Sequence, residues 1–185
     1  MRKIFFIIFF LPTILYAQHL KFMGIPIDGD INTFGKQLEA KGFKVDKTDG
    51  EVMFLTGKFT GEDVSVGILS SVESKKVCRI VVFFDKETSW SSLKTHYTRL
   101  KENYSAKYEV EKDYHFFIDP YYEGDGYEMS AVRNDKCRYS VFYKAEFGSI
   151  HLQINKIGCI SVAYEDNLNV KKLESERESK IQDDI

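Results

Sequence analysis

Short apolar runs, gathered in two groups of three, constrain the fold of this chain more than any other feature. In the clearest run, Ile150, Leu152 and Ile154 alternate with polar neighbours, which is typical of a strand with one buried and one solvated face. Short links join the runs within each group, and such links favour antiparallel neighbours. The runs span residues 51–59, 63–70, 76–84, 138–146, 149–155 and 159–165.

A helical segment precedes each group of runs. The first can begin after a capping residue, Asp30, and end at Gly42. The second carries an apolar stripe with intervals of three and four residues, which is one face of a helix that covers a sheet. The stripe consists of Trp90, Leu93, Tyr97, Leu100 and Tyr104.

This order of segments predicts an α+β fold. Two helix-plus-antiparallel-meander units would form a curved sheet with both helices on one face. The units would be a pseudo-repeat of residues 20–87 and 88–169, and both would belong to a single domain of residues 18–169. The face without helices would be the binding surface. Residues 170–185 alternate in charge and have few apolar anchors, so we expect a polar charged tail, either solvated or forming a frayed helix.

The first 17 residues have the pattern of an export signal. Arg2 and Lys3 provide the basic start, residues 4–15 are almost entirely apolar, and Ala17 is the small residue before the expected cleavage. The apolar run is shorter than the roughly 20 residues of a membrane-spanning helix. We therefore expect a periplasmic or secreted protein with no integral membrane segment after the signal is removed.

Composition excludes several classes of function. A hydrophobic fraction of 43% supplies enough apolar surface for a core, so the chain is not disordered throughout. The net charge is -2, with 26 basic and 28 acidic residues, whereas binding to a phosphate backbone requires clustered basic residues. We expect no nucleic-acid partner. No hydrolase elbow, phosphate-binding loop or zinc-binding spacing occurs, and we expect no catalytic residues and no cofactor.

The most distinctive local segment is the acidic and aromatic stretch I-D-P-Y-Y-E-G-D-G-Y-E at residues 118–128. Its carboxylates and glycines could enclose a calcium ion, although their spacing differs from the twelve-residue calcium loop. Alternatively it is a surface loop that starts a short helix near Asp125, or its tyrosines form a recognition patch. The predicted binding residues are Asp119, Tyr121, Tyr122, Glu123, Asp125, Tyr127 and Glu128.

Three cysteines are an odd number for a compartment that favours disulfides. At most one internal bridge can form, so at least one thiol is expected to be buried and unpaired, and if a bridge exists the predicted pair is Cys137 with Cys159. Cys78 would then be a buried free thiol.

Several motifs together resemble a group of small secreted proteins of unknown function common in gut Gram-negative anaerobes. They are G-I-P-I-D-G at residues 24–29, T-S-W-S-S-L at 88–93, the acidic and aromatic stretch, and V-A-Y-E-D-N at 162–167. The resemblance covers residues 22–169. The two-unit pattern is also similar to the fold of the beta-lactamase inhibitor proteins, which bind partners over a concave sheet, but fold analogy alone assigns no contact residue.

These observations predict an exported, non-catalytic binding module of the periplasm or cell envelope, with a protein or an envelope component as its partner. Tyr121 and Tyr122 would carry part of the contact. One alternative is an envelope hydrolase that uses Asp119, Glu123 or Asp125 as acid and base. Another is an exported inhibitor or immunity protein.

Overall fold

The computed structural model describes residues 18–183, and the predicted signal peptide at residues 1–17 lies outside them. The helices are α1 (Ile31–Glu39), α2 (Trp90–Ser105), α3 (Glu128–Arg133) and α4 (Asn167–Asp183). The strands are β1 (Lys21–Phe22), β2 (Ile25–Pro26), β3 (Lys44–Asp49), β4 (Val52–Phe59), β5 (Glu62–Ser70), β6 (Val77–Phe84), β7 (Glu109–Phe117), β8 (Cys137–Ala145), β9 (Gly148–Ile154) and β10 (Ile160–Asp166).

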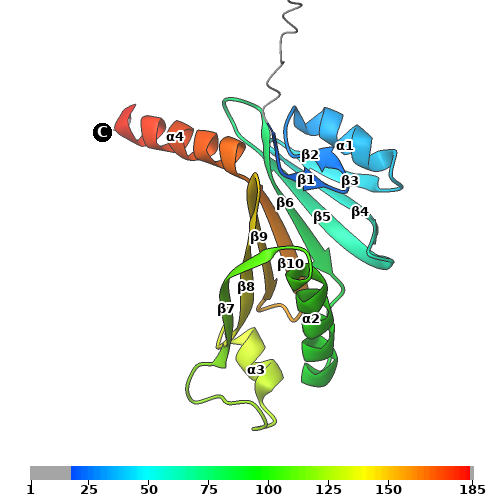
Figure 1. Ribbon diagram of the computed structural model, residues 1–185, viewed down its shortest axis with the longest axis vertical. Helices are drawn as coiled ribbons and strands as arrows, with labels where there is room; N and C mark the ends of the chain where they lie inside the picture. The colour runs from blue at the N-terminus through cyan, green and yellow to red at the C-terminus, as the bar shows by residue number, and fades with distance from the viewer. Residues whose placement is uncertain (1–17, 184–185) are drawn as a thin grey trace, which may run out of the picture.

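Within residues 18–183, eight strands form one antiparallel sheet in the order β3-β4-β5-β6-β10-β9-β8-β7. The strands of residues 44–84 fill one half of this sheet and those of residues 109–166 fill the other (Figure 1). Where the halves meet, Arg79 Nε of β6 lies 2.6 Å from Glu165 Oε1 of β10. The α+β class with an antiparallel sheet is therefore confirmed.

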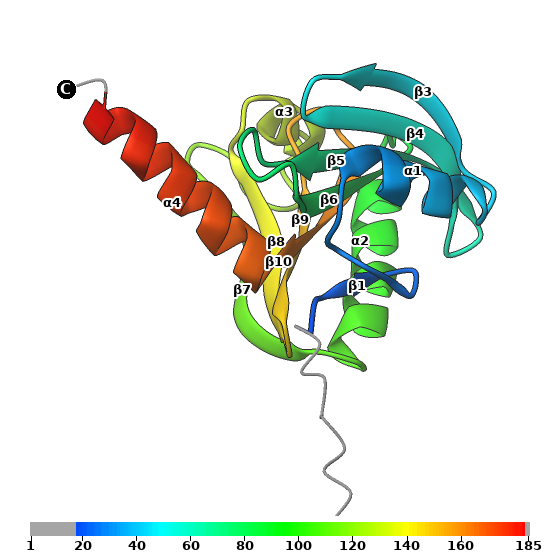
Figure 2. The same cartoon turned by 90° about the horizontal axis from the view of Figure 1, so that it is seen from above.

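The sheet bends around α1, α2 and the small β1–β2 hairpin, which lie on the same side of it (Figure 2). The face that these elements cover is the inner face of the sheet, and the opposite one is the outer face. α4 follows β10, contacts β6, β9 and β10, and projects away from the sheet on the outer side (Figure 2).

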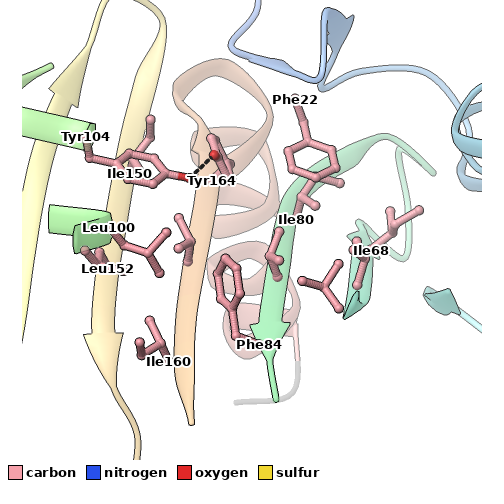
Figure 3. Close-up of a cluster of buried hydrophobic side chains, with 14 of the residues drawn as sticks. Phe22, Ile68, Ile80, Phe84, Leu100, Tyr104, Ile150, Leu152, Ile160 and Tyr164 are labelled. Carbon is pink, nitrogen blue, oxygen red and sulfur yellow. Dashed lines mark hydrogen bonds between the residues drawn. The ribbon is translucent and has the colours of Figure 1, made fainter. Parts of the chain in front are cut away.

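Apolar side chains of the inner face form the core together with both helices (Figure 3). Ile80, Ile150 and Leu152 are 0% exposed, and Leu100 of α2 is 2% exposed. Burying one such side chain contributes about 1.5–3 kcal/mol to folding. The core thus fixes which face of each strand points inward.

Both predicted helices begin at a side-chain cap, which for the first helix is the predicted Asp30. The Asp30 carboxylate accepts hydrogen bonds from the backbone N–H groups of Asn32 and Thr33, at 3.1 and 2.9 Å, at the start of α1. Ser89 Oγ accepts from the Ser92 N–H at 3.1 Å at the start of α2. The buried residues of α2 belong to the predicted apolar stripe and are Leu93, Tyr97, Leu100 and Tyr104.

β3 and β7 are the two edge strands of the sheet, and neither has the alternating apolar pattern of the inner strands. All of β7 is exposed except its last residue, Phe117, which is half-buried. Each edge strand contains an irregularity in pairing, between Val45 and Lys47 in β3 and between Val110 and Lys112 in β7. Such irregularities, together with charged side chains, oppose the addition of a further strand at an edge.

Asp166, the last residue of β10, fastens the start of the domain to the sheet. Its carboxylate is 0% exposed and lies 3.1 Å from His19 Nδ1. The same carboxylate accepts hydrogen bonds from the backbone N–H groups of Leu20 and Asn169, at 2.9 and 3.0 Å. It thereby joins the N-terminal segment to the beginning of α4.

The segment after Asp166 forms a helix that is attached to the sheet. The Asn169 amide donates to the carbonyl oxygens of Ile27 and Val77, both at 3.0 Å. Leu173 is buried, and the Glu176 carboxylate accepts from Ser71 Oγ. Of the two forms predicted for the C-terminal segment, the structure thus shows a helix, and its first turns are anchored. No helix in residues 18–183 is long and apolar enough to cross a bilayer.

Candidate functional site

The outer face carries a row of cross-strand neighbours that runs over β4, β5, β6, β10, β9 and β8. The row consists of Phe54, Gly67, Val81, Ala163, His151 and Phe142. In β7 the direct partner of Phe142 is Lys112, and the exposed Tyr114 and Phe116 lie beside the end of the row, with the ring centroids of Tyr114 and Phe142 6.5 Å apart. These eight residues are named the outer band.

Strand geometry explains why apolar residues lie on this face. Met53 and Leu55 point into the core and are 3% and 0% exposed, so Phe54 between them must point outward, where it is 44% exposed. Tyr114 and Phe116 are 42% and 49% exposed. A sheet face with several large exposed aromatic side chains is typical of an interaction surface.

The neighbouring row on the outer face is mainly polar, although it includes Phe83 and ends at Tyr114 of the outer band. Successive partners across the strands are Ser65, Phe83, Ser161, Gln153, Ser140 and Tyr114. Hydroxyl and amide groups can donate and accept hydrogen bonds, while the adjacent aromatic rings supply contact area. The two rows together offer the mixture of apolar and polar groups that recognition surfaces use.

His151 lies near the middle of the outer band and is held from two sides. Its ring stacks on Phe142, with a centroid separation of 4.0 Å and an interplanar angle of 6°. Its Nε2 lies 2.6 Å from Ser140 Oγ. Burial lowers the pKa of His151 below its ordinary value, so the imidazole is neutral at neutral pH.

This lowered pKa makes stability depend on pH. The unfolded chain binds a proton at His151 more readily than the folded chain does, with an unfolded pKa of about 6.5. The stabilising contribution is therefore fully present above about pH 6.5 and is lost as the pH falls towards the folded pKa. We expect the free energy of unfolding to fall more between pH 7 and pH 5 in the wild type than in His151→Gln, measured by urea denaturation. An equal fall in both proteins would contradict the burial effect.

Ser140 and His151 have the residue types of a nucleophile and its base. Acyl transfer also requires free N–H donors aimed at the developing oxyanion. Both residues lie within the paired segments of β8 and β9, whose backbone groups take part in the sheet ladder. The pair therefore fits a positioned polar contact on a binding face better than a catalytic centre.

The predicted binding residues lie in the loop between β7 and α3 and in the first residue of α3. Glu123 accepts hydrogen bonds from Trp90 Nε1 at 3.4 Å, from the Tyr139 hydroxyl at 3.1 Å and from Lys94 Nζ. The hydrogen bond from Lys94 is the main cause that lowers the pKa of Glu123. Glu123 thus ties the loop to α2 and β8.

The other acidic side chains of the loop also bind groups close to them. Asp125 accepts from the backbone N–H groups of Tyr122 and Tyr127, at 3.1 and 2.7 Å. Glu128 accepts from the Gly124 N–H at 2.8 Å. These contacts explain the local fold, which matches the predicted alternative of a surface loop leading into a short helix.

Two of the three loop tyrosines remain accessible. Tyr122 and Tyr127 are each 65% exposed, whereas the Tyr121 hydroxyl accepts a hydrogen bond from Asn134 Nδ2 at 3.0 Å. Asp119 is exposed. In the part of the chain that the structure describes, no three His, Cys, Asp or Glu side chains are grouped closely enough to hold a metal ion. The structure therefore provides no ligand cluster for the calcium interpretation.

The structure contains no bridge between Cys137 and Cys159, because Cys137, Cys159 and Cys78 are all free and buried. Cys137 begins β8 and Cys159 directly precedes β10, with β9 between these strands. Two strand spacings amount to about 10 Å, whereas a disulfide requires Cα atoms within about 7 Å. Burial raises the pKa of Cys137 to about 12 and that of Cys78 to about 11, which keeps both thiols protonated and unreactive.

No outer-band residue was predicted individually from sequence, although the sheet face without helices was predicted as the binding surface. One signal for it was present, because β6 is apolar at successive positions and must place Val81 and Phe83 on the face opposite Ile80 and Val82. Comparisons with models of protein families, with curated proteins and with solved structures found no match.

Proposed function

We propose that this protein is an exported, non-catalytic binding module of the periplasm or cell envelope, and that the outer band is its contact surface. The observation that carries the proposal is the exposure of Phe54, Tyr114 and Phe116 on a sheet face that α1 and α2 leave uncovered. Exposed aromatic side chains contribute large contact areas at low conformational cost. The signal sequence predicted at residues 1–17 would direct this export and would then be removed.

The partner would be a protein or an envelope component that docks on the face of the sheet. The charged, irregular edge strands β3 and β7 support docking on the face rather than addition of a strand. Tyr122 and Tyr127, which are each 65% exposed in the loop after β7, are a second candidate contact.

The fold proposal that accompanies this function is a pair of helix-plus-meander units joined at β6 and β10. The strand order supports it, because each half of the sheet contains strands from one half of the sequence. The beta-lactamase inhibitor proteins, which the sequence pattern resembles, bind over a concave sheet. Here α1 and α2 occupy the side around which the sheet bends, so the proposed surface is the outer one (Figure 2).

Two aromatic substitutions test the proposed surface. The purified protein is immobilised and incubated with an envelope extract of its source, and the retained component is identified and titrated. We expect the double variant Tyr114→Ser/Phe142→Ser to bind that component about 30-fold or more weakly, since central aromatic contacts often contribute about 2 kcal/mol or more. Circular dichroism and urea denaturation confirm that the variant is folded.

The matched control replaces two loop tyrosines, in Tyr122→Ser/Tyr127→Ser. We expect a smaller loss of affinity, because these side chains lie outside the outer band. Unchanged binding by the folded outer-band variant would refute the placement, and a larger loss in the loop variant would move the contact to residues 119–128. Catalytic turnover of the retained component would favour the envelope hydrolase instead.

A further inference from the structure

A groove of about 1530 Å³ lies on the inner side of the protein, away from the outer band. Its walls are the β1–β2 hairpin, the C-terminal end of α2 and the turn between β8 and β9. Ligand pockets for small organic molecules have volumes of about 300–1000 Å³. The groove can therefore accept such a molecule even though it is open to solvent on one side.

Aromatic rings form the floor of the groove. The Tyr104 and Tyr164 hydroxyl groups are hydrogen-bonded to each other, and these residues are only 8% and 5% exposed (Figure 3). The ring of Tyr108 stacks near Tyr104, with a centroid separation of 6.1 Å and an interplanar angle of 24°. Because the buried hydroxyl groups satisfy each other, the floor offers a ligand mainly aromatic and apolar surface.

The walls beside this floor are also apolar. Phe59 and Phe147 line the groove, and Met23 lies at the turn of the β1–β2 hairpin. A methionine side chain adapts to ligands of different shape because its thioether chain is unbranched and flexible. The groove thus suits an apolar or aromatic body rather than a strongly hydrated one.

Two lysines on the rim give the groove a cationic side. Within residues 18–183, neither Lys21 nor Lys107 has a carboxylate within ion-pair distance, although both are exposed and line the groove. Lys107 Nζ lies 5.1 Å from the centre of the Tyr108 ring, at the edge of the aromatic floor. A charged group of a bound ligand would find these ammonium groups free.

The acidic residues of the groove do not cancel this charge. Asp28 is matched by Lys76 Nζ at 3.4 Å and by His19 Nε2 at 3.7 Å. Glu146, on the turn between β8 and β9, has no cationic partner among the described residues. Its negative charge therefore offsets the charge of one of the two lysines. Two lysines against one such carboxylate leave an excess of positive charge, which favours an anionic ligand group.

We propose that the groove binds a small amphipathic organic anion, with its apolar or aromatic body over Tyr104 and Tyr108 and its acidic group at Lys21 and Lys107. This inference is independent of the outer band, because the groove lies on the inner side of the protein. It gives the protein a second binding site, for a small molecule instead of a macromolecular partner.

The probe for this site is 8-anilinonaphthalene-1-sulfonate, an aromatic anion whose fluorescence rises on binding to apolar surface. We expect saturable, one-site binding to the folded wild type in a fluorescence titration. The variant Lys21→Glu/Lys107→Glu should bind it about tenfold or more weakly, because hydrogen bonds to charged groups contribute more than neutral ones. N-phenyl-1-naphthylamine, which lacks the sulfonate, should bind the wild type and this variant alike.

Two further variants separate the groove from other sites. Asn103→Trp places a bulky ring into the groove from an exposed position on α2 and should weaken binding of both probes. Lys112→Glu/Lys144→Glu makes the same change of charge beside the outer band and should leave both affinities unchanged. Cooperative urea denaturation of each variant shows that the probes report on folded protein.

Three results would overturn the proposal. The first is the absence of saturable sulfonate binding to the folded wild type. The second is equal sulfonate affinity in the wild type and in Lys21→Glu/Lys107→Glu. The third is a loss of affinity confined to Lys112→Glu/Lys144→Glu, which would place the probe on the outer face.

Discussion

Replacing Asp166 with alanine is expected to lower the free energy of unfolding by about 3–5 kcal/mol, because it removes a buried carboxylate that accepts several backbone hydrogen bonds. The carboxylate is 0% exposed and lies beside His19, which is itself only 12% exposed. Its removal would leave the backbone N–H groups of Leu20 and Asn169 without their acceptor. Each buried donor without a partner costs about 1–3 kcal/mol.

Urea denaturation of the wild type, Asp166→Ala and Asp166→Asn measures this effect. The asparagine variant keeps one oxygen acceptor, so its loss should be smaller than that of the alanine variant. Asp63→Ala is the control, because the Asp63 carboxylate pairs with Lys58 at 3.0 Å but is 75% exposed. Such a surface pair contributes about 1 kcal/mol or less. Similar losses for Asp166→Ala and Asp63→Ala would contradict the role of Asp166 as the fastening point.

Gly148→Ala is expected to destabilise the protein by about 3 kcal/mol, at the upper end of what overpacking usually costs. Gly148 begins β9 and faces the last residues of β10. A Cβ atom there would lie 2.2 Å from the Glu165 carbonyl oxygen and 2.8 Å from Leu20 Cδ2. The carbonyl oxygen belongs to the sheet backbone and cannot move away without disturbing the pairing of β9 with β10.

Gly67→Ala is the matched control for this substitution, since Gly67 also lies in a strand of the same sheet. A Cβ atom at Gly67 would meet Phe54 at 3.7 Å, which is ordinary van der Waals contact. We expect a change in the free energy of unfolding below about 1 kcal/mol, because alanine also costs less backbone entropy than glycine. A small loss for Gly148→Ala, similar to that for Gly67→Ala, would show that the β9–β10 pairing tolerates the displacement.

Periodicity in the sequence was sufficient to predict the central strands and the amphipathic helices α1 and α2. These elements each have one side against the core, so burial imposes a regular spacing on their apolar residues. β7 carries no such pattern, because it lies at an edge and its residues from Glu109 to Phe116 are exposed. α4 is likewise attached by only a few residues, including Asn169 and Leu173. Because most of its other residues are polar, its sequence shows no regular apolar spacing.

The outer band could not be predicted from spacing along the chain. Phe54, His151 and Phe142 become neighbours of one surface only through the pairing of strands that are distant in sequence, above all β6 with β10. The loop of residues 119–128 could be proposed as a site from sequence because its acidic and aromatic residues are adjacent along the chain. In the structure, Glu123, Asp125 and Glu128 hold the loop in place, and Tyr122 and Tyr127 are its accessible aromatic residues.

Hydroxyl-radical footprinting tests most directly whether the outer band is the contact surface. Oxidation of Phe54, Tyr114 and Phe116 is measured by mass spectrometry in the free protein and in its complex with the component retained from the envelope extract. We expect clear protection of these three side chains on binding, because all are between 42% and 49% exposed in the free protein. Unchanged oxidation of all three in a saturated complex would contradict the proposed binding surface.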